Sequence, residues 1–210
     1  MTESRMRDHW WWRPGWRVGR RMYTFHTTFQ DQPDLHRLVA AYQAPLSALN
    51  GLDLIPYQWL HLTMQGIGFT DEVSDADIAA ITEAATARLA TVGPVRLTFT
   101  RPVTDPEALQ FHVQPADQMR EIRHAVRQAI ADVWGPERVP DSEQWTPHVS
   151  IAYSHSDGPI EPYAKALDSV PADPVTITVR QIQLIVLDRD EHVYRWTTKA
   201  AIPLLAAGIG

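Results

Sequence analysis

The chain has 210 residues, a length that favours one domain or two small lobes that share a core. A net charge of −6 argues against sequence-independent binding to duplex DNA, which needs a broadly basic face. The absence of cysteine excludes disulfides, thiolate nucleophiles and zinc–thiolate sites. No apolar run reaches the roughly 18 residues that span a bilayer, so we expect no membrane partner and a cytoplasmic protein.

The first residues differ in composition from the rest. Residues 1–21 hold six arginines against two acidic residues, a net charge of +4, whereas the remainder of the chain carries −10. We treat residues 1–19 as an N-terminal arm, which also contains four tryptophans: Trp10, Trp11, Trp12 and Trp16. In one interpretation, residues such as Trp12 and Arg17 stack on bases and pair with phosphates along one wall of a substrate cleft. In the other, the tryptophans cover an apolar surface or make an oligomer contact.

Hydrophobic periodicity and turn residues predict a series of alternating strands and helices. In chain order these are a strand at 20–29, a helix that starts within 31–34 and has Leu35, Leu38, Val39, Tyr42 and Leu46 on one face, a strand at 59–69, a helix capped by Ser74 or Asp75 and ending near 89, and strands at 95–100 and 109–113. A helix from Pro115 to about 133, a strand at 145–153, a short helix near 163–167, a long strand at 175–187 and a last strand at 192–198 follow. The apolar tail 203–210 has no predicted place.

The order β-α-β-α-β occurs twice, followed by an extra hairpin strand, which predicts an α+β fold built from one duplicated unit. Phe25-His26 matches Phe111-His112 at an offset of 86 residues. His61-Leu62-Thr63-Met64 matches His148-Val149-Ser150-Ile151 at an offset of 87. We therefore predict a single bilobal domain over 20–202, with pseudo-repeats of about 20–101 and 107–198.

The two matching tetrads have a polar and an apolar face, because side chains alternate along a strand. His61 and Thr63 share one face, about 6.6 Å apart, and His148 and Ser150 do the same. The same alternation assigns Gln65 to the face of His61 and Tyr153 to the apolar face of its strand. If the two strands lie side by side, the two imidazoles face each other across a cleft.

Such a pair of imidazoles suits phosphodiester chemistry. One can take a proton from water while the other donates a proton to the leaving alkoxide. The hydroxyls of Thr63 and Ser150 can donate hydrogen bonds to phosphoryl oxygens. The set lacks the acidic cluster that a divalent-cation phosphatase needs. Two alternatives stay open: structural histidines, or imidazoles that bind zinc, although no H-x-x-x-H or H-E-x-x-H spacing occurs.

The two tetrads, in the segments WLHLTMQGIG and TPHVSIAY, resemble the 2H phosphoesterase superfamily, and within it the bacterial 2′-5′ RNA ligase or RNA 2′,3′-cyclic phosphodiesterase family. The resemblance covers about residues 20–198. It implies a bilobal α+β fold, with two antiparallel sheets around a pseudo-twofold central cleft and helices outside. It also implies metal-independent catalysis in which His61 and His148 exchange the roles of general acid and base. Family members commonly begin at the first strand, so the arm leaves the substrate identity open.

The expected substrate is a small nucleotide or short RNA end with a 2′,3′-cyclic phosphate or a 2′-5′ linkage, with weak 2′-5′ RNA ligase activity as the reverse reaction. No cofactor and no metal are expected, and a monomer is favoured. The alternative function is a non-catalytic nucleotide- or RNA-binding module with the same fold. Besides Thr63 and Ser150, which hold the phosphate, the candidates for substrate contact are His26, His112, Gln65, Trp12 and Arg17. His26 and His112 are alternatively structural or exposed, and Gln65 is alternatively a residue of the sheet surface.

Overall fold

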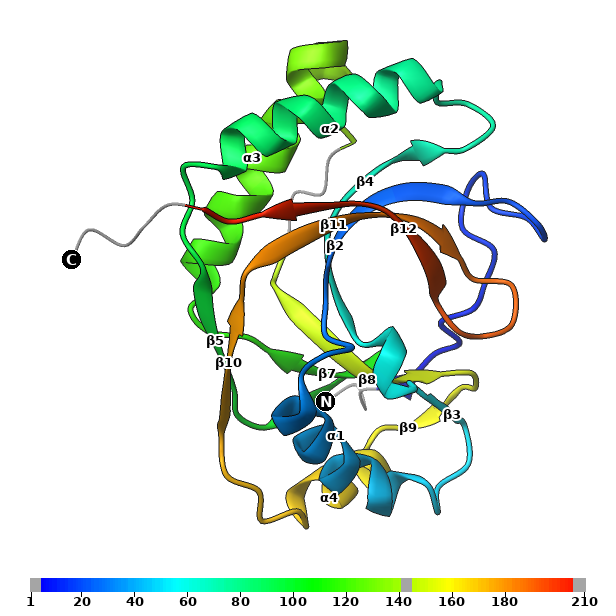
Figure 1. Ribbon diagram of the computed structural model, residues 1–210. Helices are drawn as coiled ribbons and strands as arrows, with labels where there is room; N and C mark the ends of the chain where they lie inside the picture. The colour runs from blue at the N-terminus through cyan, green and yellow to red at the C-terminus, as the bar shows by residue number, and fades with distance from the viewer. Residues whose placement is uncertain (1–4, 141–144, 206–210) are drawn as a thin grey trace.

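A computed structural model describes residues 5–140 and 145–205 (Figure 1). Its strands are β1 (Arg5–Met6), β2 (Met22–Thr28), β3 (Leu52–Leu54), β4 (His61–Phe69), β5 (Val95–Phe99), β6 (Pro102–Asp105), β7 (Ala108–His112), β8 (His148–Ser154), β9 (Gly158–Pro159), β10 (Val175–Val179), β11 (Gln181–Asp188) and β12 (Arg195–Pro203). Its α-helices are α1 (Pro33–Leu46), α2 (Asp75–Leu89), α3 (Ala116–Trp134) and α4 (Glu161–Asp168). Short 3₁₀ turns cover Tyr57–Trp59 and Pro136–Arg138.

Two four-stranded antiparallel sheets form the centre of the molecule. Their strand orders are β12-β11-β2-β4 and β3-β8-β7-β6. The adjacent strands β2 and β4 in one sheet correspond to β7 and β8 in the other. Two-stranded pairs, β5 with β10 and β1 with β9, complete the architecture. The predicted α+β fold, with duplicated units and two antiparallel sheets, is confirmed.

The helices lie outside the sheets in two pairs. Helix α2 packs against α3, and α1 packs against α4; α3 also contacts β4, and α1 contacts β8. The two pairs lie at opposite ends of the view in Figure 1. Helix α1 buries Leu35, Leu38, Val39, Tyr42 and Leu46, which is the apolar face predicted from the sequence. In the part of the chain that the structure describes, no helix has the length and apolar character needed to cross a membrane.

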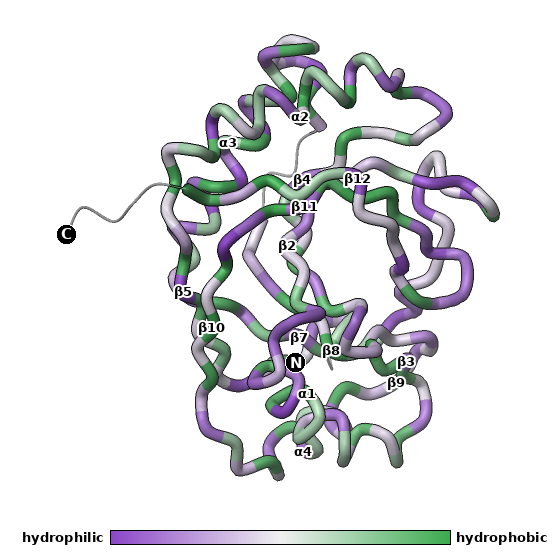
Figure 2. Tube along the Cα trace, in the orientation of Figure 1, coloured by the Kyte–Doolittle hydropathy of each residue, from purple (hydrophilic) through white to green (hydrophobic). Residues whose placement is uncertain are grey.

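The core lies between the helices and the apolar faces of the sheets. The strands that carry the two tetrads, β4 and β8 (the motif strands), supply Leu62 and Val149. Their neighbours supply Phe25 and Phe111, and none of these four side chains is exposed. Figure 2 shows hydrophobic and hydrophilic residues mixed along each element, as expected when one face packs and the other does not. The polar faces of β4 and β8 are therefore left for the space between the sheets.

Three predictions of secondary structure are corrected. The segment 175–187 is two strands, because β10 pairs with β5 whereas β11 pairs with β2 and β12. The segments 52–54 and 102–105, for which no strand is predicted, form the short strands β3 and β6. Strand β12 continues to Pro203 and Leu204 is buried, so part of the apolar tail belongs to the fold. Residues 206–210 lie outside the described residues.

Candidate active site

A β-bulge occurs at the same place in each motif strand. In β4, Met64 is the extra residue, because consecutive residues of β2 pair with Thr63 and Gln65. In β8, Ile151 is the extra residue in the same way. A bulge places two residues of one strand opposite one residue of its partner, so the alternation of side chains is reversed beyond it.

The bulges correct the two assignments that simple alternation gave. Tyr153 lines the space between the sheets together with Ser150, instead of joining the apolar face. Gln65 does not line that space. Its side chain donates a hydrogen bond to the carbonyl oxygen of Pro140 (2.9 Å) and accepts one from Arg127 of α3 (2.9 Å). Gln65 is therefore a structural residue beneath a helix rather than a contact to substrate.

A cavity of about 440 Å³ lies between the two sheets. It brings together the residues of the two tetrads that share polar faces: His61, Thr63, His148 and Ser150. The flanking strands β2 and β7 add His26 and Gln110. The cavity size is in the range of small-molecule sites, and its polar groups converge from both lobes.

The two imidazoles are held in the same way. The Nδ1 atom of His61 lies 2.8 Å from the carbonyl oxygen of Trp59, and Nδ1 of His148 lies 2.8 Å from that of Thr146. A carbonyl oxygen only accepts, so each Nδ1 carries a proton and donates it. Each Nε2 is then the ring atom that can exchange a proton with a bound substrate.

Burial makes both imidazoles weak bases. It lowers the pKa of His61 to about 4, although the bond to Trp59 opposes this. Burial also lowers the pKa of His148, against the bond to Thr146. Both rings are therefore neutral near pH 7 in the unliganded protein, as a general base must be. A phosphate anion bound between them would raise both pKa values, which allows one ring to hold the proton that a general acid needs.

His26 supports the first tetrad from the neighbouring strand. Its ring stacks on His61 with a centroid distance of 4.5 Å and an angle of 2° between the planes. Its Nε2 shares a hydrogen bond of 3.2 Å with the Thr63 hydroxyl. Burial lowers the pKa of His26 well below its usual value, so the ring is a neutral hydrogen-bonding partner. His26 thus fixes the positions of both polar groups of the first tetrad.

The counterpart of His26 in the second lobe is Gln110, not His112. His26 pairs with Thr63, and Gln110 pairs with Ser150, whereas His112 pairs with His148 at the end of β7. His112 is exposed and does not line the cavity. The predicted match of Phe25-His26 with Phe111-His112, at an offset of 86 residues, is therefore wrong, because the two dipeptides pair with different positions of the tetrads.

The arm does contribute to the cavity, but through residues that the sequence did not single out. Trp12 is 50% exposed and Arg17 pairs with Asp71 at the surface (3.3 Å); neither lines the cavity. His9, Arg13 and Trp16 do line it. The composition indicates that the arm is unusual, but a segment without periodicity does not show which of its side chains face the cavity.

Comparisons with known proteins place the chain in a family. The sequence model of the 2′-5′ RNA ligase superfamily matches residues 29–191. The chain belongs to this superfamily. Membership supports a two-histidine phosphoesterase function of the 2′-5′ RNA ligase type. Comparison with curated protein sequences gives no significant match.

Solved structures share the fold at low sequence identity. TT0787 of Thermus thermophilus is 17% identical, with a TM-score of 0.66 over 89% of this chain and 98% of that one. E. coli LigT complexed with 3′-AMP is 14% identical, with a TM-score of 0.65 over 88% of this chain and 98% of that one. The superfamily match and this fold therefore agree.

The described residues offer no evident place for a metal. Over 5–140 and 145–205, no three His, Asp or Glu side chains come together in an arrangement that could hold an ion. Metal independence stays a prediction.

Proposed function

We propose that the protein is a phosphodiesterase acting on 2′,3′-cyclic phosphates or 2′-5′ linkages of RNA ends or small nucleotides. The observation that carries the proposal is the matched pair of imidazoles. His61 and His148 come from equivalent strands, each is oriented by the carbonyl two residues before it, and both line one cavity. A nucleotide-binding module would have no need for two such proton-transfer groups.

The proposed reaction uses each imidazole once. One neutral histidine takes a proton from water, and the water oxygen forms a bond to phosphorus. The bond between phosphorus and the leaving ribose oxygen breaks, and the second histidine, protonated in the complex, donates its proton to that oxygen. Thr63 and Ser150 donate hydrogen bonds to the non-bridging oxygens, where charge grows during attack. The orientation of the substrate decides which histidine has which role, and ligation is the weak reverse of cleavage of a 2′-5′ linkage.

A small nucleotide or a short RNA end is the proposed ligand. E. coli LigT has been crystallised with 3′-AMP, with NADP⁺ and with ATP, which supports nucleotides as the ligand class. The charge of −10 outside residues 1–21 disfavours long, sequence-independent RNA binding. We propose that neither a metal nor another cofactor takes part.

A substrate panel in the presence of EDTA tests the proposal. We expect hydrolysis of at least one of three substrates: adenosine 2′,3′-cyclic phosphate, an RNA oligonucleotide with a cyclic phosphate end, and a 2′-5′-linked diadenylate. EDTA should leave the rate unchanged. Binding of all three without hydrolysis would favour the non-catalytic module. Loss of activity in EDTA that zinc restores would contradict metal independence.

The pH dependence of hydrolysis follows from the buried imidazoles. We expect kcat/KM to follow a bell whose maximum lies on the acid side of about pH 6.5, because this ratio reports the free enzyme and burial lowers the pKa of His61 and of His148. The kcat profile should lie at higher pH, because the bound phosphate favours the protonated rings. Initial rates between about pH 4 and pH 9 measure both curves. A flat kcat/KM profile would argue against a histidine pair.

A further inference from the structure

The arm, described from residue 5 to residue 19, joins the two lobes across one end of the cavity. At its start β1 pairs with β9, and the amide of His9 donates to the carbonyl of Ser154 at the end of β8 (2.8 Å). At its far end Arg17 pairs with Asp71, and the amide of Gly19 donates to Asp190 (2.9 Å). The superfamily match begins at residue 29, after the arm.

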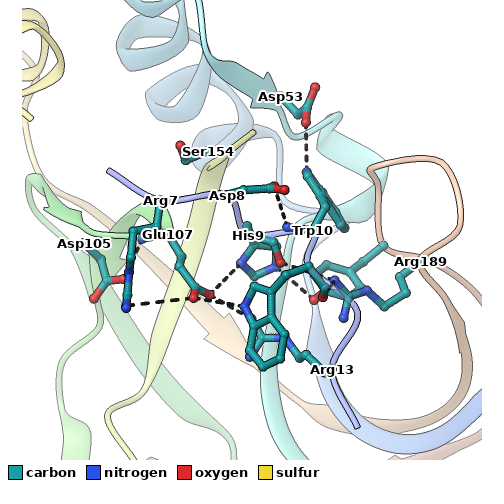
Figure 3. A network of polar contacts seen from close by, with 12 residues as sticks. Arg7, Asp8, His9, Trp10, Arg13, Asp53, Asp105, Glu107, Ser154 and Arg189 are labelled. Carbon is teal, nitrogen blue, oxygen red and sulfur yellow. Dashed lines mark hydrogen bonds and ion pairs between the residues drawn. The ribbon is translucent and has the colours of Figure 1, made fainter. Parts of the chain in front are cut away.

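Glu107 and two aromatic side chains hold the middle of the arm against the cavity, and Figure 3 shows Glu107 between His9 and Arg13. Arg13 donates to Glu107 (2.8 Å), and Nδ1 of His9 lies 3.3 Å from the same carboxylate. The His9 ring stacks on Tyr153 at 4.1 Å, and its Nε2 shares a hydrogen bond of 2.9 Å with the hydroxyl of Tyr194. Since Tyr153 belongs to the motif strand β8, the arm places His9 and Arg13 next to the proposed reaction centre.

Arg189 is a buried cation beside the arm. It is 3% exposed and lines the cavity. One terminal nitrogen donates to the carbonyls of His9 and Trp11, at 3.3 Å each, while the other, NH1, has no hydrogen-bond partner. Within the described chain no carboxylate pairs with it. Burial of a charge without a counter-ion is costly, so this guanidinium is suited to an anion that enters the cavity.

The charges that line the cavity favour the arginine side as the place for an anion. Burial lowers the pKa of His9 to about 3 and of His61 to about 4, so these rings are neutral near pH 7. Arg13 and Arg189 are then the fixed cations among the lining residues. Two carboxylates, Asp105 and Glu107, also line the cavity, and Glu107 is engaged by Arg13.

We propose that Arg13 and Arg189 form an anion subsite that binds a second phosphate of the substrate, beside the phosphodiester at the two histidines. The placement of the first phosphate rests on the proposed function. The ligand class is a nucleotide that carries a phosphate in addition to the one that is cleaved, such as a 5′-phosphate. A guanidinium presents a planar fork of donors that matches phosphate oxygens, which makes two arginines a suitable pair.

Two stable nucleotides that differ by one phosphate test the subsite. Calorimetry compares adenosine 3′,5′-bisphosphate with adenosine 3′-monophosphate. We expect the bisphosphate to bind the unaltered protein at least about tenfold more tightly, since charge-assisted hydrogen bonds are strong. Arg13→Gln and Arg189→Gln should each reduce this ratio to about threefold or less. Arg17→Gln is the matched control, because it removes an arm arginine that does not line the cavity and should keep the ratio.

The outcomes separate the subsite from the proposed function. Arg189 also holds the arm, whereas the Arg13 side chain is 36% exposed and its loss leaves the Arg189 contacts intact, so Arg13→Gln is the decisive variant. Equal affinities for the two nucleotides, or an unchanged ratio in Arg13→Gln, would overturn the subsite. If the protein hydrolyses a cyclic phosphate but binds the bisphosphate no more tightly than the monophosphate, the proposed function stands and the subsite is wrong. If the bisphosphate binds more tightly but no panel substrate is hydrolysed, the subsite stands and the proposed function is wrong.

Discussion

His61→Ala and His148→Ala are each expected to lower kcat for the best panel substrate by about 10²- to 10⁴-fold, the usual cost of losing one positioned acid or base. Each ring lines the cavity and neither belongs to the hydrophobic core, so its removal enlarges the cavity and opens no void in the core. Circular dichroism and thermal melting should therefore remain close to those of the unaltered protein. Single-turnover and steady-state rates on one substrate measure the effect.

His112→Ala is the matched control for these two variants. His112 lies opposite His148 in the sheet, yet it is exposed and outside the cavity, so its loss should leave kcat within about threefold. The double variant His61→Ala/His148→Ala should be little slower than either single variant, because groups that act as a unit are not additive. Nearly full activity in either single variant would contradict the two-histidine mechanism.

Deletion of residues 1–17 is expected to raise KM by about tenfold or more, with a smaller fall in kcat. The arm supplies His9, Arg13 and Trp16 to the cavity but neither of the two proposed catalytic imidazoles. The deletion should also lower the melting temperature, because Met6 and Trp10 are buried in the core. Steady-state kinetics and thermal unfolding of the truncated protein measure the two effects separately.

Trp12→Ala is the control within the arm, because Trp12 is 50% exposed and lies outside the cavity. It should change neither KM nor the melting temperature. If the truncated protein melts earlier but keeps its KM, the arm serves only for packing, which is the second interpretation of its composition.

The elements that carry the site could be predicted from the sequence, whereas their registers could not. Periodicity located α1 and α2, and Ser74 caps α2 as expected, with its hydroxyl accepting from the amide of Asp77 (3.1 Å). The bulges at Met64 and Ile151 were missed, because an extra residue is defined only by how the partner strand pairs. For this reason Gln65 and Tyr153 were assigned to the wrong faces.

The cavity residues outside the motif strands could not be predicted from the sequence either. Arg189 follows β11, and Glu107 lies in the turn between β6 and β7, so neither has a periodic neighbour that gives its direction. Their roles depend on contacts with the arm, whose residues lie 94 positions from Glu107 (Arg13) and 180 positions from Arg189 (His9) in the chain. A segment without periodicity reveals its inward side chains only through such distant contacts.

The equivalent bulges also determine how far the duplicated cavity departs from symmetry. The residue that each bulge turns inward is Gly66 in β4 and Tyr153 in β8, at matching positions of the two strands. A cavity with true twofold symmetry would accept a nucleotide in two opposite directions with the same energy. Here the inward residue of one strand has no side chain, whereas that of the other is a phenol ring on which His9 of the arm stacks. The two directions therefore differ in energy, so we expect the proposed nucleotide to bind in one preferred direction, which would give each histidine a single role.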